Sequence, residues 1–361
     1  MLLTKQCVGI DISKATFNVS LLGQSASSSD VVTCRRGKKF ANTASGFTEF
    51  VGWLQTVIQP QVSLVFVMEA TGVYHEALAY FLLQRHYHVS IVLPNKVSAY
   101  ARSLNQSSKT DALDAQLIAR LGLERSLPAW TSPSPIIRQI KALTRHLQAL
   151  TEAKTVTKNQ LHAAQHVAYP LAGVLENYAD IIALYETKIA LLEREIKALV
   201  RTDKSMADLI ENLQTIPGVG FRTASAIVAE TGCFQLFTSR GQLLKFAGMD
   251  IKEKQSGSSV HGRSRLSKTG NSRIRRALYM PSLQFTRGDN PISQLYARVL
   301  DRTGIKMKAL VAAQRKLLVV MYALAKTGQA YQADYAENRH RKRVGEPKLA
   351  YSDSIGQGHG S

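Results

Sequence analysis

The chain has 361 residues, enough for two or three domains, and its 45% apolar content is enough to build a core in each. Lysine and arginine number 46 against 26 aspartate and glutamate residues, giving a formal net charge of +20 at pH 7. This composition excludes a disordered or low-complexity protein. The charge excess indicates a polyanionic partner, which is either nucleic acid or a membrane surface.

We expect no targeting signal in the N-terminal region. No run of about eighteen apolar residues is present, and the first residues, MLLTKQCVGI, lead directly into a strand-like segment. We therefore expect a cytoplasmic protein without a membrane partner. Cys7, Cys34 and Cys233 lie far apart and lack C-x-x-C or Cys/His spacing, which favours packing thiols over disulfides or a zinc site.

Positive charge is concentrated in the second part of the chain. Residues 1–125 hold 12 basic and 8 acidic side chains, whereas residues 240–316 hold 17 basic and 4 acidic ones. In the densest part, residues 252–276, glycine and serine are interleaved with the basic residues. Backbone N–H groups and side chains of such a segment can both contact phosphates, although a charge run alone is often only a solvated surface.

The first 125 residues alternate strand and helix signals. CVGIDIS and FNVSLL are predicted as adjacent strands, SLVFVMEA and HVSIVLP as buried strands, and residues 74–86 and 109–122 show helical apolar spacing. This pattern predicts an α/β domain. The segment PAWTSPSP, with three prolines, marks its end.

Two heptad-like apolar stripes follow, from Ile136 to Leu161 and from Ile182 to Leu199, with a turn near Pro170. Two long helices that fold back as a coiled-coil hairpin explain both stripes, the first helix being about 45 Å long at 1.5 Å per residue. Such a stripe is typical of a structural or dimerising element.

The remaining residues up to 335 are predicted to be mostly helical. ENLQTIPGVGFRTASAIVAETG joins two helices through a tight turn containing Gly218 and Gly220, with the second helix expected to open at Thr223. This is the helix-hairpin-helix pattern, whose glycines let backbone N–H groups approach a phosphate. A plain turn between two helices is the alternative. Residues 336–361 are expected to be a disordered tail.

Four carboxylates form the sharpest candidate site. Asp11 follows the apolar run CVGI, which puts it near the centre of a strand, and Glu69 ends the strand LVFVME. Asp111 and Asp114 are spaced i, i+3 and so share one face of a helix. Carboxylates in buried strands are costly unless they are paired or bind metal, and carboxylates can hold two Mg²⁺ ions about 4 Å apart for phosphodiester cleavage.

Two other interpretations of these residues stay open. Asp111 has a residue type that commonly caps a helix N-terminus. An ATPase of the actin-like class also has an aspartate at the end of its first strand, but it has glycine-rich phosphate loops after that residue, and DISKATF contains none.

A second candidate is the serine-rich segment QSGSS at residues 255–259, inside the basic region. A serine hydroxyl attacks a phosphodiester only if a base or metal removes its proton while cations stabilise the developing charge. The basic neighbours meet the second requirement, but a flexible Ser/Gly loop is the alternative. Spacing does not choose among Ser256, Ser258, Ser259, Ser264 and Ser267.

Five motifs in order resemble the DEDD-type insertion-sequence transposases, a family that includes bridge-RNA-guided recombinases and is related to Piv-type DNA invertases. The motifs are GIDISKATFNV, MEATGVYHEALAYFL, KTDALDAQLIA, IPGVGFRTASAIVAETG and FAGMDIKEKQSGSSVHGRSRLSKTGNSRIRRALYMPS. The resemblance extends over roughly residues 5–330.

The resemblance implies three parts, and the tail expected from composition follows them. These are an α/β RuvC-like (RNase H-like) domain at 1–127, a coiled-coil hairpin at 136–204, a mostly α-helical transposase domain with the helix-hairpin-helix at 205–335, and the tail at 336–361. It further implies that Asp11, Glu69, Asp111 and Asp114 bind Mg²⁺, and that Ser256 is the nucleophile that joins covalently to DNA. In the guided members, a noncoding bridge RNA pairs with both target and donor DNA.

We therefore expect a DNA transposase that cuts and rejoins donor and target DNA without ATP, guided by a noncoding RNA and working as a dimer or tetramer at the bacterial nucleoid. A RuvC-like nuclease that uses water, and a non-catalytic nucleic-acid-binding scaffold, are the alternatives. Nucleic-acid contacts are expected from Lys252, Arg263, Arg265, Lys268, Arg273, Arg275, Arg276, Gly218 and Gly220.

Overall fold

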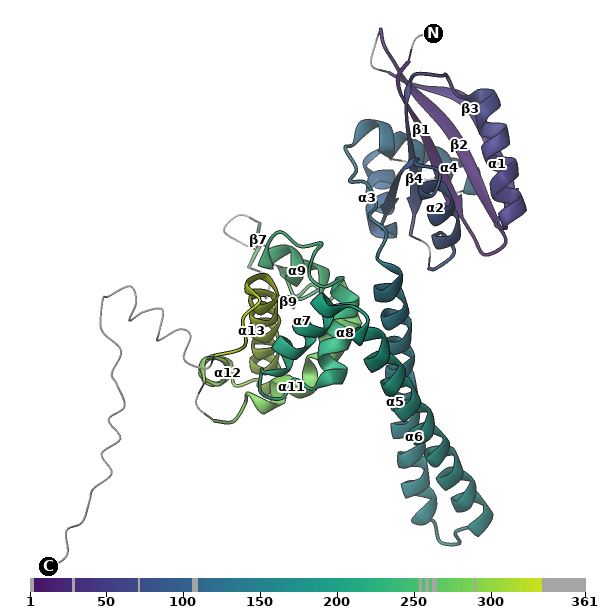
Figure 1. Cartoon of the computed structure of the whole chain (residues 1–361). Coiled ribbons are helices and arrows are strands. Elements are labelled where there is room, and N and C mark those ends of the chain that lie inside the picture. The colour runs from purple at the N-terminus through teal and green to yellow at the C-terminus, as the bar shows by residue number, and fades with distance from the viewer. Residues whose placement is uncertain are drawn as a thin grey trace, which may run out of the picture. The chain divides into compact units, whose positions relative to one another are not determined.

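The computed structural model divides the chain into two compact units, residues 1–132 and 133–361, with the division inside the proline-containing segment (Figure 1). The structure describes residues 3–27, 30–70, 72–105, 110–252, 255–256, 260–261, 265–288 and 290–332, and it describes no side chains for residues 32–36 and 252–264. The predicted tail lies outside the described residues. Within the described part, no helix has the length and apolar character needed to cross a lipid bilayer.

The first unit contains a five-stranded mixed sheet with the strand order β3-β2-β1-β4-β5. The strands are β1 (Leu3–Ile12), β2 (Thr16–Ser25), β3 (Val31–Ala41), β4 (Ser63–Glu69) and β5 (His88–Val92). The first three strands form an antiparallel meander, whereas β4 pairs in parallel with both β1 and β5. The carboxyl ends of β1, β4 and β5 therefore lie at one edge of the sheet.

The two faces of this sheet are covered by different helices. These are α1 (Ala44–Val57) and α2 (Glu76–Leu83) on one face, and α3 (Pro94–Ser103) and α4 (Asp111–Glu124) on the other. The face under α1 and α2 holds an aromatic core that includes Phe17, Phe50 and Phe66. Because side chains alternate along a strand, Ile10 and Ile12 face this core while Cys7 faces α4.

The sequence pattern missed three elements of this unit, β3, α1 and α3, and it misplaced Asp11 within its strand. Asp11 is the penultimate residue of β1, so the expectation that it lies near the strand centre is wrong. β1 pairs with β2 as far as Ile12, and the connection to β2 follows directly. The polar residue therefore sits where the strand emerges from the core.

The second unit begins with a helical hairpin made of α5 (Pro135–Gln165) and α6 (Ala172–Arg201), which pack along each other. α5 has 31 residues, which corresponds to about 46 Å. On α6 the buried residues Ile182, Ile189 and Ile196 recur every seven positions, as the heptad pattern predicts. Thr157 interrupts the stripe on α5, and its hydroxyl donates to the carbonyl of Ala153 at 3.0 Å.

The described part of this unit contains seven more helices: α7 (Lys204–Gln214), α8 (Phe221–Thr231), α9 (Arg240–Phe246), α10 (Ser272–Ala277), α11 (Tyr279–Gln284), α12 (Pro291–Thr303) and α13 (Lys306–Thr327). Their shared core includes Phe234, Leu243 and Leu317 and extends to Ile140 and Ile196 of the hairpin. Between α9 and α10, the segment expected to be a loop contains two short antiparallel ladders. These are β6 (Ile251–Lys252) with β9 (Arg265–Leu266), and β7 (Gln255–Ser256) with β8 (Val260–His261).

Candidate active site

Helix α4 packs directly onto the backbone of β1. A Cβ atom on Gly9 would lie 2.1 Å from the carbonyl oxygen of Ala115 and 2.2 Å from the amide nitrogen of Ala119. Further along, a Cβ on Gly122 would lie 2.5 Å from the sulfur of Cys7. Cys7, earlier in β1, therefore lies near the later part of α4, whereas Gly9, nearer the end of β1, lies near the earlier part of α4. The N-terminus of α4 therefore lies at the carboxyl end of β1.

Asp11 and Glu69 lie at this end of the sheet on neighbouring strands. Ile10 pairs with Met68 in the parallel ladder, so the two carboxylates occupy the next position along each strand. Asp11 is two residues after Gly9, which α4 covers, and Glu69 is two residues after Val67, whose side chain is close to Gly122 of α4. Both carboxylates are half-buried and belong to the face that α4 covers.

Asp111 and Asp114 occupy the first turn of α4, where the helix dipole favours negative charge. Thr110 caps this helix and its hydroxyl accepts a hydrogen bond from the amide of Leu113 at 3.3 Å. The alternative that Asp111 is the N-cap is therefore wrong. Instead, the Oδ2 atom of Asp111 accepts from Nδ2 of Asn18 at 3.5 Å, and Asn18 is the partner of Asp11 in the β1–β2 ladder.

The four carboxylates supply only oxygen ligands, the type that Mg²⁺ prefers. β1, β4 and α4 bring them to one edge and one face of the sheet, and Asp11 and Glu69 each already take part in polar interactions. Across the described ranges, no group of three or more His, Cys, Asp or Glu side chains is close enough to hold a metal ion. The donor chemistry therefore fits a divalent cation, and coordination requires a closer approach of these side chains.

Asn42 connects two loops at the same edge and was not singled out from the sequence. Its Nδ2 donates to the carbonyl of Ser13 at 3.0 Å and to the carbonyl of Tyr74 at 3.1 Å. Ser13 follows β1, and Tyr74 lies between β4 and α2. A loop asparagine has no sequence signal that distinguishes this role from a simple turn residue.

Ser256 lies in β7, where its backbone pairs with Val260, and its side chain lies outside the described residues. Backbone hydrogen bonds join the two ends of the surrounding segment: the amides of Ser267 and Lys268 donate to the carbonyls of Asp250 and Gly248 at 2.9 and 3.1 Å. A Cβ on Gly270 would lie 2.4 Å from the carbonyl oxygen of Phe246. We call residues 248–271 the serine loop, and its base is closely packed.

The expected phosphate-binding residues differ in their surroundings. Arg265, Lys268 and Arg273 are exposed. Arg275 donates from Nη1 to the carbonyl of Ala247 at 2.7 Å, and Arg276 forms an ion pair with Glu152 of α5. The side chains of Lys252 and Arg263 lie outside the described residues.

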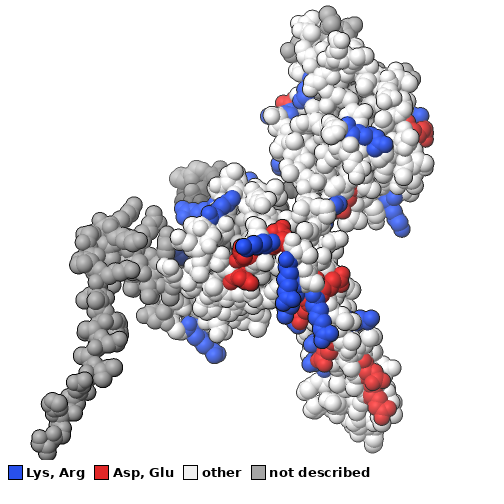
Figure 2. Space-filling view, in the orientation of Figure 1, with Lys and Arg blue, Asp and Glu red and all other residues white. Residues whose placement is uncertain are grey.

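Opposite charges also lie side by side along the hairpin, as Figure 2 shows. Lys154 and Lys158 of α5 both pair with Glu186 of α6, with N–O distances of 3.5 and 3.6 Å. Positive charge on this part of the surface is therefore partly neutralised within the chain.

The glycine turn between α7 and α8 has a structural reason for at least one of its glycines. Gly218 has φ +79°, and a Cβ there would lie 2.9 Å from Cβ of Gln284. Gly220 is the N-cap of α8, which begins at Phe221, two residues earlier than the expected Thr223. A Cβ on Gly220 would meet no atom within 4 Å. Contact of either glycine with DNA stays a prediction.

Two family models match the chain. The model of IS110-type DEDD transposases, described as a transposase, matches residues 8–170, and the model described as the transposase IS116/IS110/IS902 family matches residues 210–297. The pilin gene-inverting protein of Moraxella bovis is 30% identical over 331 residues, which are 91% of this chain and 98% of that protein. This chain belongs to the IS116/IS110/IS902 family of transposases.

The chain is also similar to a transposase with lower identity. The transposase for insertion sequence element IS1111A of Coxiella burnetii is 23% identical over 354 residues, covering 90% of this chain and 91% of the relative. As a member of the IS116/IS110/IS902 family, the chain is a DNA transposase or recombinase, and the scaffold alternative is set aside. The expected resemblance to DEDD-type transposases is confirmed. The four carboxylates fall in the first matched region, and Ser256 falls in the second.

Proposed function

We propose that this transposase cuts and rejoins DNA with Ser256 as the nucleophile, assisted by Mg²⁺ at Asp11, Glu69, Asp111 and Asp114. The observation that supports this proposal most directly is the common position of the four carboxylates, at one edge and on one face of the sheet. The antiparallel meander followed by two parallel strands supports a RuvC-like domain. Similarity to a gene-inverting protein supports recombination between two DNA segments.

The proposed reaction conserves the energy of the phosphodiester bond. The Oγ atom of Ser256 attacks a DNA phosphorus, a P–O bond to serine forms, and the original P–O bond breaks to release a DNA hydroxyl end. A hydroxyl end from the second DNA then attacks the same phosphorus and releases serine. No net bond energy is lost, so no ATP is needed.

The protein's own residues have distinct roles in this scheme. The four carboxylates would hold the metal ions, and bound Mg²⁺ would stabilise negative charge on the reacting phosphate. Exposed Arg265, Lys268 and Arg273 would hold neighbouring phosphates and fix the DNA backbone.

The proposal includes a noncoding guide RNA and a homo-oligomer, either a dimer or a tetramer. The net charge of +20 supports binding of both RNA and DNA. At the turn of the hairpin, Tyr169 is 89% exposed and Leu171 is 70% exposed, which supports the hairpin as a contact between protomers.

The decisive experiment looks for DNA attached to protein. Full-length protein, the noncoding RNA that flanks its gene, labelled donor and target DNA and Mg²⁺ are incubated and run on a denaturing gel. We expect a protein–DNA adduct with the native chain and with Ser258→Ala, and none with Ser256→Ala or Asp11→Asn. Mixing Ser256→Ala with Asp11→Asn restores the adduct only if the site is shared between chains.

Two outcomes would contradict the proposal. DNA cleaved without an adduct would favour the nuclease that uses water, for which Ser256 is dispensable. An adduct that persists in Ser256→Ala would assign the nucleophile to another residue.

A further inference from the structure

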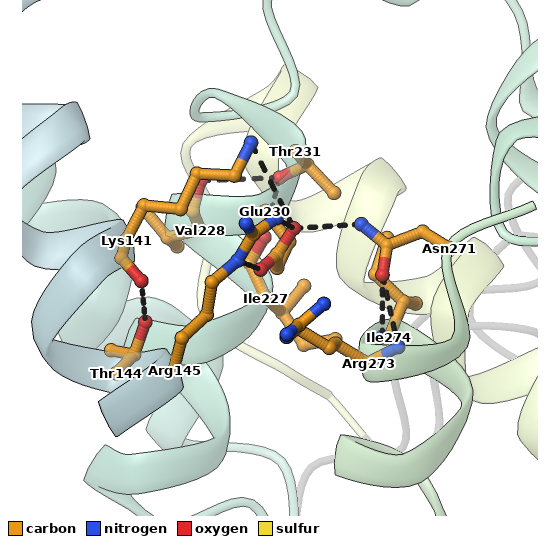
Figure 3. A network of polar contacts seen from close by, with 10 residues as sticks. All are labelled: Lys141, Thr144, Arg145, Ile227, Val228, Glu230, Thr231, Asn271, Arg273 and Ile274. Atoms are coloured by element: carbon orange, nitrogen blue, oxygen red, sulfur yellow. Dashed lines mark hydrogen bonds and ion pairs between the residues drawn. The ribbon is translucent and has the colours of Figure 1, made fainter. Parts of the chain in front are cut away.

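A buried carboxylate connects three elements of the second unit. Glu230, at the end of α8, has a side chain that is only 3% exposed. Arg145 of α5 donates to both of its oxygens, from Nε to Oε1 at 2.6 Å and from Nη2 to Oε2 at 2.9 Å. Lys141 places its Nζ 3.8 Å from Oε2. Figure 3 shows Glu230 between these two cations and Asn271.

Asn271 is the last residue of the serine loop, and each of its polar side-chain atoms is used. Its Nδ2 donates to Oε2 of Glu230 at 2.7 Å. Its Oδ1 caps α10 by accepting from the amides of Arg273 and Ile274 at 3.0 and 3.2 Å. Its own amide donates to the carbonyl of Phe246 at 2.8 Å. Asn271 therefore fixes the point where the serine loop returns to the helical core.

Stability alone is a weak reason for this arrangement. Burying a carboxylate with a cation costs desolvation energy that the attraction often only balances, and well-packed apolar residues commonly do as well. The ionic arrangement fixes the orientation of the Glu230 carboxylate, because a bidentate arginine and a short amide hydrogen bond each hold it in one orientation. The network thus fixes the end of the serine loop relative to α5.

We infer that Glu230 is a positioning residue for the serine loop: by holding Asn271 toward Arg145, it orients the base of this loop, where β6 pairs with β9, relative to the α5–α6 hairpin. The inference rests on the proposed role of Ser256. The contact with α5 means that a displacement of the hairpin base also displaces the loop. The four carboxylates proposed to bind metal lie outside this network, and so do the side chains of Arg265, Lys268 and Arg273. Arg273 contributes only its backbone amide, which donates to Asn271.

The test uses a substitution that removes one hydrogen bond and keeps the helix cap. Asn271→Asp retains an oxygen that caps α10 but replaces the donor to Glu230 with a second carboxylate. We expect the rate of adduct formation with saturating DNA to fall roughly tenfold or more. DNA affinity should stay within about twofold, because the exposed basic residues are unchanged.

A second substitution, at position 230, should restore the hydrogen bond that Asn271→Asp removes. When Glu230→Gln is added to Asn271→Asp, the side-chain amide at position 230 donates to the carboxylate at position 271, so the hydrogen bond runs in the opposite direction. The amide oxygen at position 230 still accepts from Arg145. We expect this double substitution to recover most of the lost rate. Glu230→Gln alone should instead lower the native rate, because its single oxygen does not accept from both Arg145 and Asn271. The control is Leu317→Ala, a fully buried core residue outside the network. It should lower the melting temperature and leave the rate at 25 °C unchanged.

A second measurement does not depend on serine chemistry. Hydrogen exchange of the amides of Ser267 and Lys268, which close the base of the serine loop, should become at least about tenfold faster in Asn271→Asp. It should return toward the native rate in the double substitution. If the native chain forms no adduct, the proposed function fails, and this exchange measurement alone decides the role of Glu230.

Three results would overturn the inference. Asn271→Asp could form the adduct at the native rate, or the folded double substitution could show no recovery. A loss of rate in Leu317→Ala equal to that in Asn271→Asp would show that general destabilisation explains the effect.

Discussion

Gly9 of β1 and Ala115 of α4 are in backbone contact: a methyl group on Gly9 would lie 2.1 Å from the carbonyl oxygen of Ala115. This closeness lets the first turn of α4, with Asp111 and Asp114, approach the carboxyl end of β1, where Asp11 lies. A side chain at position 9 would separate the two elements.

Substituting Gly9 should therefore affect both stability and catalysis. We expect Gly9→Ala to lower the free energy of unfolding by about 1–3 kcal/mol because it overpacks the contact with α4. Adduct formation should fall more than stability explains, because the α4 carboxylates move away from Asp11. Urea unfolding and the adduct assay measure the two effects.

The matched control is Gly52→Ala. Gly52 is exposed in the middle of α1, and a Cβ there would meet no atom within 4 Å. This substitution should stabilise the chain by about 0.5–1 kcal/mol through helix propensity and leave the adduct rate unchanged. Equal behaviour of the two alanine variants would contradict the importance of the Gly9 contact.

The Glu230 network makes a contribution to stability that is lost in acid. Burial raises the pKa of Glu230, but the hydrogen bonds from Arg145 and Asn271 and the charges of Arg145 and Lys141 outweigh burial and lower that pKa below its usual range. The unfolded chain therefore binds the proton more tightly than the folded one. The stabilisation is complete above the ordinary glutamate pKa of about 4.3 and is lost as pH falls through the lower, folded-state pKa.

Unfolding by urea between pH 7 and pH 3 tests this expectation. The native chain should be more stable than Glu230→Gln at pH 7, and the difference should shrink at acid pH as the carboxyl is protonated. A difference that stays constant down to pH 3, or that grows, would show that the pKa of Glu230 is not lowered by folding.

The basic residues of the serine loop and α10 should separate into two groups. Alanine at exposed Arg265, Lys268 or Arg273 should weaken DNA binding and reduce the slope of log K against log salt by about 0.9 per lost phosphate contact. Arg275→Ala instead removes the hydrogen bond to Ala247 and should destabilise the fold by about 1 kcal/mol with the slope unchanged. A reduced slope for Arg275→Ala would mean that this arginine leaves its internal partner to bind DNA.

The thiols of buried Cys7 and half-buried Cys233 should react slowly. Burial raises the pKa of Cys7 to about 12, despite the opposing charge of Lys5, and burial together with Asp203 raises the pKa of Cys233 to about 11. In a Cys34→Ser background, thiol reagents at pH 8 should react with Cys7 at least about a thousandfold more slowly than with a free cysteine, since the thiolate is the reactive form. Fast labelling of Cys7 in the folded chain would show that β1 and α4 separate readily.

Much of the fold follows from local sequence patterns of apolar residues, but some helices and strands have no such pattern. The hairpin stripes and the strands with apolar runs were predictable because burial there repeats at a fixed spacing. β3 was missed because VVTCRRGKKFA carries four basic residues, which an edge strand tolerates. α1 was missed because it contains Gly46 and Gly52, and a Cβ on Gly46 would lie 2.0 Å from the carbonyl of Ala41.

The candidate site was predictable to the extent that its residues belong to motifs. Asp11, Glu69, Asp111 and Asp114 follow recognisable strand and helix signals, and the pairing of β1 with β4 accounts for why two of them are neighbours. Asn42 and Asn271 carried no signal because their contacts join segments far apart in the sequence. Polar bridges of that kind depend on tertiary structure and have no local spacing.

The parallel pairing of Ile10 with Met68 also restricts where this protein can change in length. Side chains alternate across a strand, so one inserted or deleted residue inside β1 or β4 would turn its carboxylate toward the aromatic core formed by Phe17 and Phe66. Insertions between α1 and β4, or between α2 and β5, leave the alternation intact. Length differences among related transposases should therefore collect in those connections, and the spacing from the buried apolar run to the acidic residue should be constant in both strands.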